Sequence, residues 1–199
     1  GSSSNISLRG CKVYDIKNDC LVLDSGDDWR SAHAILVLGT NNEKPIRNLL
    51  IEGCEVFDIH SGTSESVTLA GNVTDFTIQD NEVHDVGDIS VNFARNGMVR
   101  RNRVYRCTHE LSQDFWSQSV SNGGAIGIYL CGNANTIVEQ NEVFACDRGI
   151  GLCSESYKLQ TRDCIVRHNF VYNNVRTGIY LGAYLGFDGL STKSCYIVN

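Results

Sequence analysis

The sequence of 199 residues predicts an all-β solenoid, in which short strands stack coil upon coil. The main observation is a short phrase containing Asn or Cys, any residue, Val, and then an aromatic residue or His. It occurs six times, and a seventh copy starts at Cys195. The six copies occupy residues 6–16, 49–59, 76–86, 97–107, 136–146 and 164–174. Self-similarity at a spacing of 20 to 50 residues indicates stacked supersecondary units.

The second observation is that both parts of each repeat have the periodicity of strands. Apolar and polar residues alternate within the phrase, as in Phe76-Thr77-Ile78, and a period of two is typical of a strand. A second strand family follows each phrase, and no stretch has sustained helical periodicity. Its members lie at residues 34–37, 66–69, 88–91, 127–130, 149–152 and 178–181.

The third observation is that like residues fall into columns when the repeats are aligned. Stacking of like on like lets a solenoid bury a continuous core, whereas a β-sandwich of short meandering strands, the alternative, has no reason to keep such columns. Buried Asn side chains can also pair with backbone groups and with each other. The predicted inward columns are Ile35, Val67, Ile89, Ile128, Ile150, Ile179 and Val37, Leu69, Val91, Leu130, Leu152, Leu181; the outward column is Leu36, Thr68, Ser90, Tyr129, Gly151, Tyr180; the Asn column is Cys11, Cys54, Asn81, Asn102, Asn141, Asn169.

The repeated motifs carry a resemblance to a known group of proteins. These motifs are the Gly-Ile-x-Leu strands and Asn81-Glu-Val-His, Asn102-Arg-Val-Tyr, Asn141-Glu-Val-Phe and Asn169-Phe-Val-Tyr. With them the chain resembles the right-handed parallel β-helix repeat proteins of the pectate-lyase-like superfamily. The resemblance implies a single-stranded right-handed parallel β-helix of about seven coils. It covers essentially the whole chain and is specific for the fold, not for the reaction.

Composition and the chain ends indicate the domain organisation, the possible partners and the location of the protein. Residues 1–4 read as a cloning scar and residues 5–199 as one β-helix domain. We expect this domain to be a piece of a longer solenoid, because open ends need flanking segments or a capping partner. The net charge of −6 without a basic stripe argues against nucleic acid, and no apolar run is long enough for membrane insertion. We expect a secreted, periplasmic or cell-surface protein whose signal is absent from this sequence.

Eight of the nine cysteines fall in same-column pairs on neighbouring coils, and Cys20 is left over. Stacked Cα atoms lie within the roughly 4.4–6.8 Å that a disulfide tolerates, but parallel side chains are poorly aimed at one another. This favours reduced thiols that act as small hydrophobes. The absence of any CxxC pair argues against a zinc site. The pairs are Cys11 with Cys54, Cys107 with Cys146, Cys131 with Cys153, and Cys164 with Cys195.

Unequal loops at one corner predict a groove. Two long segments, residues 17–33 and 108–124, leave the corner that follows the phrase, while the coils between them have only residues 60–65 and 87–88 there. Two tall walls would therefore flank a low floor, with Arg95 approaching from the third coil. The walls would present Trp29, Asp28, His109, Glu110, Asp114 and Trp116, and the floor His60, Ser61, Glu65, His84, Asp85 and Asp88.

Aromatic walls with carboxylates suit a polysaccharide or oligosaccharide, because Trp stacks on sugar rings and carboxylates bind hydroxyls. The candidate substrate-binding residues are Trp29, Trp116, Asp28, Asp114 and His109. The candidate catalytic residues are Glu65, Asp88, Arg95, His60 and His84, and the candidate calcium ligands are Asp24, Asp27 and Asp28. Each has a structural alternative: the tryptophans can cover the solenoid flank, His84 can stack in a column of aromatic residues, and the Asp cluster can be a soluble turn.

The resembled superfamily includes polysaccharide lyases, glycoside hydrolases and uronate epimerases. A hydrolase needs two carboxylates, for which Glu65 and Asp88 are the predicted pair. A lyase needs a cation such as calcium and a base, which would be Arg95, His60 or His84. The alternative to an enzyme is a non-catalytic carbohydrate-binding or structural segment of a larger surface protein. An ice-binding solenoid is disfavoured because only Thr68 provides threonine in the outward column.

Overall fold

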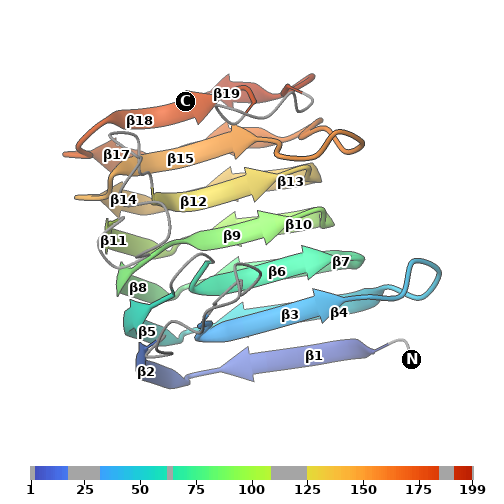
Figure 1. The fold of residues 1–199 in the computed structure, drawn as a ribbon, viewed down its shortest axis with the longest axis horizontal. Coiled ribbons are helices and arrows are strands. Elements are labelled where there is room, and N and C mark those ends of the chain that lie inside the picture. The colour runs from blue at the N-terminus through green and yellow to red at the C-terminus, as the bar shows by residue number, and fades with distance from the viewer. Residues whose placement is uncertain (1–2, 18–31, 62–64, 109–124, 184–190, 199) are drawn as a thin grey trace, which may run out of the picture.

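The computed structural model describes residues 3–17, 32–61, 65–108, 125–183 and 191–198. The strands in these ranges form three sheets, all parallel, and successive coils stack along one axis (Figure 1). The predicted parallel β-helix is therefore confirmed. These ranges contain no helix that could cross a membrane.

Each of the first six coils contributes one strand to each sheet, and β19 (Tyr196–Val198) adds a seventh strand to the first sheet. The first sheet contains β1 (Ser4–Arg9), β4 (Ile46–Glu52), β7 (Val73–Gln79), β10 (Arg95–Arg100), β13 (Ala134–Glu139), β16 (Ile165–Arg167) and β19. The second sheet contains β2 (Lys12–Lys17), β5 (Glu55–His60), β8 (Glu82–Val86), β11 (Arg103–Cys107), β14 (Glu142–Phe144) and β17 (Phe170–Tyr172). The third sheet contains β3 (Ile35–Gly39), β6 (Val67–Gly71), β9 (Ile89–Asn92), β12 (Ile126–Cys131), β15 (Arg148–Cys153) and β18 (Thr177–Leu181).

Two corners of the coil matter for the argument below. The chain enters the third sheet at the entry corner, where residues 87–88 connect β8 to β9, and leaves it at the exit corner, where residues 93–94 connect β9 to β10. At the N-terminal end, Ser4, which the sequence assigns to a cloning scar, lies in β1 and pairs with Arg47.

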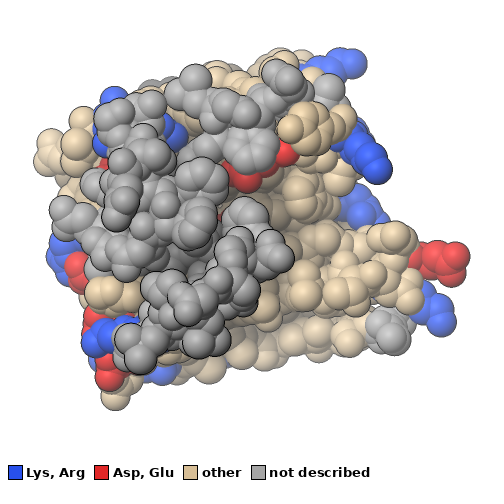
Figure 2. Space-filling model, viewed as in Figure 1, with Lys and Arg blue, Asp and Glu red and all other residues tan. Residues whose placement is uncertain are grey.

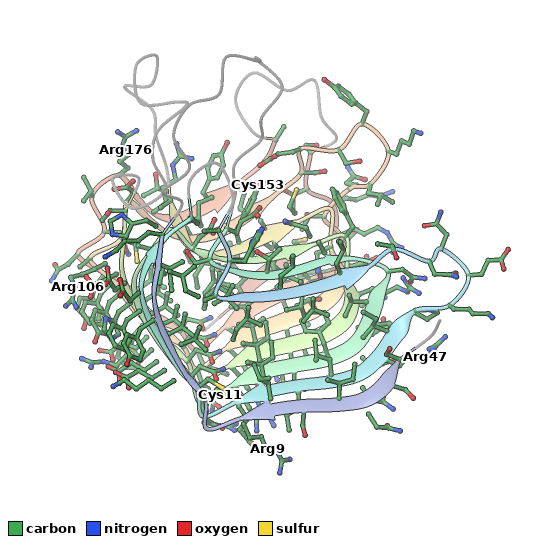
Figure 3. The ribbon with its side chains drawn as sticks, turned by 60° about the horizontal axis from the view of Figure 1, so that its bottom comes forward. Arg9, Cys11, Arg47, Arg106, Cys153 and Arg176 are labelled. Carbon is green, nitrogen blue, oxygen red and sulfur yellow. The ribbon has the colours of Figure 1, made fainter. Side chains whose placement is uncertain are left out.

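The third sheet has the register that the sequence columns predict. Ile89 pairs with Val67 on one side and with Ile128 on the other, and all three side chains are buried. The outward column is also as predicted, since Ser90 pairs with Thr68 and with Tyr129. The inward residues of all three sheets join one continuous core, and Figure 3 shows side chains filling the space between the sheets.

The predicted Asn column is a hydrogen-bonded ladder at the turn between the first and second sheets. The backbone N–H and Nδ2 of Asn81 both donate to Oδ1 of Asn102, at 3.1 and 2.8 Å. Asn102 donates in the same way to Asn141, and Asn141 to Asn169. Each side chain thus satisfies the turn of the preceding coil, which would otherwise bury unpaired amide groups.

The described ranges contain every cysteine but Cys20, and all of the cysteines in these ranges are free thiols. Burial raises the pKa of the Cys153 thiol to about 12, and it raises the pKa of the Cys164 thiol to about 12 as well. These thiols therefore stay protonated and act as small core residues.

The Asn ladder yields a stability prediction. Replacing Asn102 with Ala leaves the amide groups of Asn81 without an acceptor, so the free energy of unfolding should fall by about 2–4 kcal/mol. The exposed Asn42 is the control, and Asn42→Ala should change stability by less than about 0.5 kcal/mol. Equilibrium urea denaturation measures both, and equal losses would contradict the role of the ladder.

Candidate functional site

The outer face of the third sheet carries buried polar side chains at its centre. Thr68, Ser90 and Tyr129 follow one another in the outward column and are 3%, 0% and 4% exposed. Leu36, at the N-terminal end of the same column, is 48% exposed. Polar groups that point away from the core and are nonetheless buried require hydrogen-bond partners on this face.

Glu65 is held above this column by its backbone. The carbonyl oxygen of Glu65 accepts hydrogen bonds from Nδ1 of His33 at 2.7 Å and from Oγ1 of Thr68 at 3.2 Å. Its Oε1 accepts a hydrogen bond from Nδ2 of Asn92 at 3.0 Å, and Oδ1 of Asn92 accepts one from Ser90 at 2.8 Å. Side chains of β6 and β9 therefore orient the carboxylate along the sheet.

Glu155 reaches the same face from the turn that follows β15. Its Oε1 accepts a hydrogen bond from the hydroxyl of Tyr129 at 2.9 Å, and its backbone N–H donates to Sγ of Cys131 at 3.3 Å. Burial raises the pKa of Glu155, and the charge of Glu65 raises it further, against the opposing effect of the Tyr129 hydrogen bond. Burial also raises the pKa of Tyr129 far above its ordinary value, so the phenol remains a donor.

Asp88 occupies the short entry corner before β9. The alternation of the strand places it on the same outward side as Ser90 and Asn92. Its Oδ1 is buried and has no hydrogen-bond partner in the part of the chain that the structure describes. Burial raises the pKa of Asp88 well above its usual range, and the charges of Glu65 and Glu155 raise it further.

These three carboxyl groups form what we call the carboxylate site: Glu65, Asp88 and Glu155. Acidic side chains are visible near the middle of this face in Figure 2. Mutual repulsion among neighbouring carboxylates favours protonation of some members while another stays ionised. Burial raises the pKa of Asp88 and of Glu155, which makes these two groups the candidate proton donors of the site.

Glu65 and Asp88 lie at the same corner, since the N–H of Ser66 donates to the backbone carbonyl oxygen of Asp88 at 3.3 Å. The predicted His60 and His84 lie on the second sheet instead. His84 stacks between Phe57 and Tyr105, with ring centroids 5.2 and 4.7 Å away, and its Nδ1 lies 2.7 Å from Oδ2 of Asp85. His60 ends β5, and its Nε2 lies 3.4 Å from Oδ1 of Asp58. Both histidines thus have partners on their own sheet.

Arg95 lies at the exit corner, where it begins β10. Its Nη1 donates to Oδ1 of Asn72 at 3.0 Å. It is therefore at the opposite end of β9 from Asp88. The buried Ser61, another predicted floor residue, belongs to the entry corner just after β5.

Comparison with known proteins identifies the family. The family described as "Right handed beta helix region" matches residues 1–183. The chain belongs to this family. It is also 32% identical over 196 residues to "Uncharacterized protein YwoF" of Bacillus subtilis (strain 168), a match that covers 92% of this chain and 39% of the relative. The chain thus spans about two fifths of the length of that relative. No solved structure matches this chain.

Several predicted residues of this β-helix lie outside the described residues. They are the groove-wall residues Trp29, Asp28, His109, Glu110, Asp114 and Trp116, and the candidate calcium ligands Asp24, Asp27 and Asp28. Within the described ranges, no three His, Cys, Asp or Glu side chains are grouped so that they could hold a metal ion.

The sequence reasoning missed Glu155, Tyr129, Asn92 and His33. Asn92 could have been found, because Asp88, Ser90 and Asn92 alternate along one strand and must share its outward side. The sequence places Tyr129 in the outward column, but its burial, which distinguishes it from a surface residue, is visible only in the structure. Glu155 gave no signal, because its position depends on the path of the turn after β15.

The raised pKa of Asp88 leads to a prediction about stability and pH. The folded state binds this proton more tightly than the unfolded state, whose Asp pKa is about 3.9. The wild type should therefore lose stability as the pH rises from about 4 toward the folded pKa. Asn cannot ionise, so Asp88→Asn should unfold at a higher temperature than the wild type at pH 7 to 8, and this advantage should shrink toward pH 4.

Thermal unfolding followed between pH 4 and 8 measures this difference. The control is Asp75→Asn, because Asp75 is exposed and forms a surface ion pair with Arg47 at 3.6 Å and a long hydrogen bond with Asn96 at 3.5 Å. Its melting temperature should follow that of the wild type at every pH. A difference between Asp88→Asn and the wild type that does not depend on pH would contradict the assignment.

Proposed function

We propose that the carboxylate site hydrolyses a glycosidic bond in a polysaccharide or oligosaccharide. The observation that supports this most is that two carboxyl groups are held by hydrogen bonds on the outer face of one sheet, Glu155 by Tyr129 at 2.9 Å and Glu65 by Asn92 at 3.0 Å. Glycoside hydrolases require such a pair, one carboxyl group protonated and one ionised. The family supplies the fold and leaves the reaction open.

In this proposal Glu155 is the general acid. Its side chain is only partly buried, and Tyr129 donates to Oε1, which leaves the other oxygen to carry the proton toward the leaving group. Glu65 is the base or nucleophile, and Asn92 fixes its direction. Asp88 is a neighbour of this pair without a direct role, because its buried Oδ1 is shielded from a bound sugar.

Hydrolysis fits this site better than β-elimination. A lyase neutralises the carboxylate of a uronate with a cation before a base takes the neighbouring proton. The charges that shift the pKa of Glu155 and Asp88 are those of other acidic groups. Arg95, the predicted cationic candidate, is hydrogen-bonded to Asn72 at the exit corner. A polysaccharide substrate in turn favours a location outside the cell.

The proposal predicts that Glu65→Gln and Glu155→Gln each lower turnover by about a hundredfold or more, with the fold retained. Both substitutions keep the shape of the side chain and remove its acid–base chemistry. The control is Glu139→Gln on the first sheet, where Glu139 pairs with Arg167 at 2.8 Å away from the site. This control should keep wild-type turnover.

The assay is a panel of plant, algal and animal polysaccharides, scored for new reducing ends and for the near-ultraviolet absorbance of unsaturated uronate. Reducing ends without that absorbance are the expected result. The absorbance of unsaturated uronate would contradict hydrolysis and support a lyase. Binding without turnover, by a folded sample, would instead support a carbohydrate-binding or structural segment of a larger protein.

A further inference from the structure

The exit corner next to the carboxylate site contains one residue that does not suit its backbone. Three successive coils have a left-handed residue at this corner: Gly71 with φ of +80°, Phe93 with φ of +63° and Gly132 with φ of +59°. They are equivalent, because each follows one of the register partners Ala70, Asn92 and Cys131. Only Phe93 is not glycine, and a residue with a Cβ is disfavoured in this conformation by about 1–2 kcal/mol.

The Phe93 ring does not compensate by entering the core. Its side chain is 36% exposed and lies over the neighbouring coil. A Cβ added to Gly132 would be 2.6 Å from Cδ1 of Phe93 and 3.3 Å from Cβ of Leu159, so the ring lies against the bare backbone of Gly132. The glycine makes room for the ring, and the rest of the ring faces solvent. Non-glycine residues with positive φ also occur at other turns of the described coils, such as Arg101 and Ala145, so what distinguishes Phe93 is an exposed aromatic ring at a corner where the neighbouring coils have glycine.

Phe93 also adjoins the groups that hold the carboxylates. It directly follows Asn92, whose Nδ2 donates to Glu65. Its backbone N–H donates to the carbonyl oxygen of Cys131 at 2.8 Å, and Sγ of Cys131 accepts the N–H of Glu155. Phe93 is therefore one residue away from a group that bonds Glu65 and is hydrogen-bonded to a residue that bonds Glu155, which places it at the exit-corner rim of the carboxylate site.

The surface around this rim is apolar and uncharged. Leu38, Ala70 and Asn92 are register neighbours on β3, β6 and β9, and Leu38 is 54% exposed. Figure 2 shows a continuous uncharged surface over these strands on the right half of the face. Among the described residues the carboxylate site itself presents acidic groups, which disfavour the carboxylate of a uronate, and Arg95 at the exit corner is hydrogen-bonded to Asn72.

We propose that Phe93 is the stacking platform of the carboxylate site and that its ligand is a neutral oligosaccharide with an apolar pyranose face. Aromatic rings bind such faces while neighbouring carboxylates bind the hydroxyl groups. This inference rests on the proposed function, because it takes the carboxylate site to bind sugar. It adds the residue that selects the ligand and the class of sugar selected.

Calorimetric titration with neutral hexasaccharides of β-linked glucose, xylose and mannose, and with a galacturonate hexasaccharide, tests this inference. The wild type should bind at least one neutral probe more tightly than the galacturonate. Phe93→Gly, which suits the left-handed backbone, should bind that probe about tenfold more weakly, and Phe93→Tyr should bind it like the wild type. The control is Phe170→Gly, because Phe170 is 75% exposed on β17 of the second sheet.

The outcomes separate the two proposals. If the wild type binds a neutral probe and folded Phe93→Gly binds it equally well, the platform is overturned while the carboxylate site stands. Preference of the wild type for galacturonate overturns the neutral ligand class. If the wild type binds none of the probes and cleaves no polysaccharide, the proposed function fails, and the platform fails with it. Circular dichroism of each variant confirms that the fold is intact.

Discussion

The feature on which the rest of the structure depends is the residue-for-residue hydrogen bonding of each coil to the next. In the third sheet, the pairing of Val67 with Ile89 and of Ile89 with Ile128 decides which side chains enter the core. Because the side-chain period of a strand is two, a register slip of one residue would move the polar side chains of the outward column into the core. The Asn ladder holds this register at the turn, where backbone amides bond to side-chain oxygens of the following coil.

A regular solenoid of this kind has equivalent coils, so a site arises where the corners differ. The entry corner is two residues long before β9, which brings Asp88 against the outer face. The turn after β15 returns Glu155 over the same face, and the backbone of Glu65 is held there by His33 and Thr68. The arrangement buries acidic groups that would be more stable in water, and the regular core supplies the stability that allows it.

The sequence could predict the features that repeat from coil to coil, but not those that depend on the shape of a single corner. The columns and the aromatic stack of the second sheet depend on repeat register, which alternation reveals. The contribution of Glu155 depends on the conformation of a single turn, and the separation of His84 from the site depends on which outer face its column occupies. A single sequence encodes neither in its periodicity, because the same residues can serve either face until the corner geometry is known.

The most direct test of this account is the crystal structure of the Glu65→Gln variant soaked with the neutral hexasaccharides. The account predicts a sugar ring at the exit corner of β9 and β12, beside Glu155. A glycosidic oxygen should lie within hydrogen-bond distance of Glu155, and a pyranose face should contact Phe93. Sugar bound instead along the aromatic stack of the second sheet, with the carboxylate site empty, would contradict it.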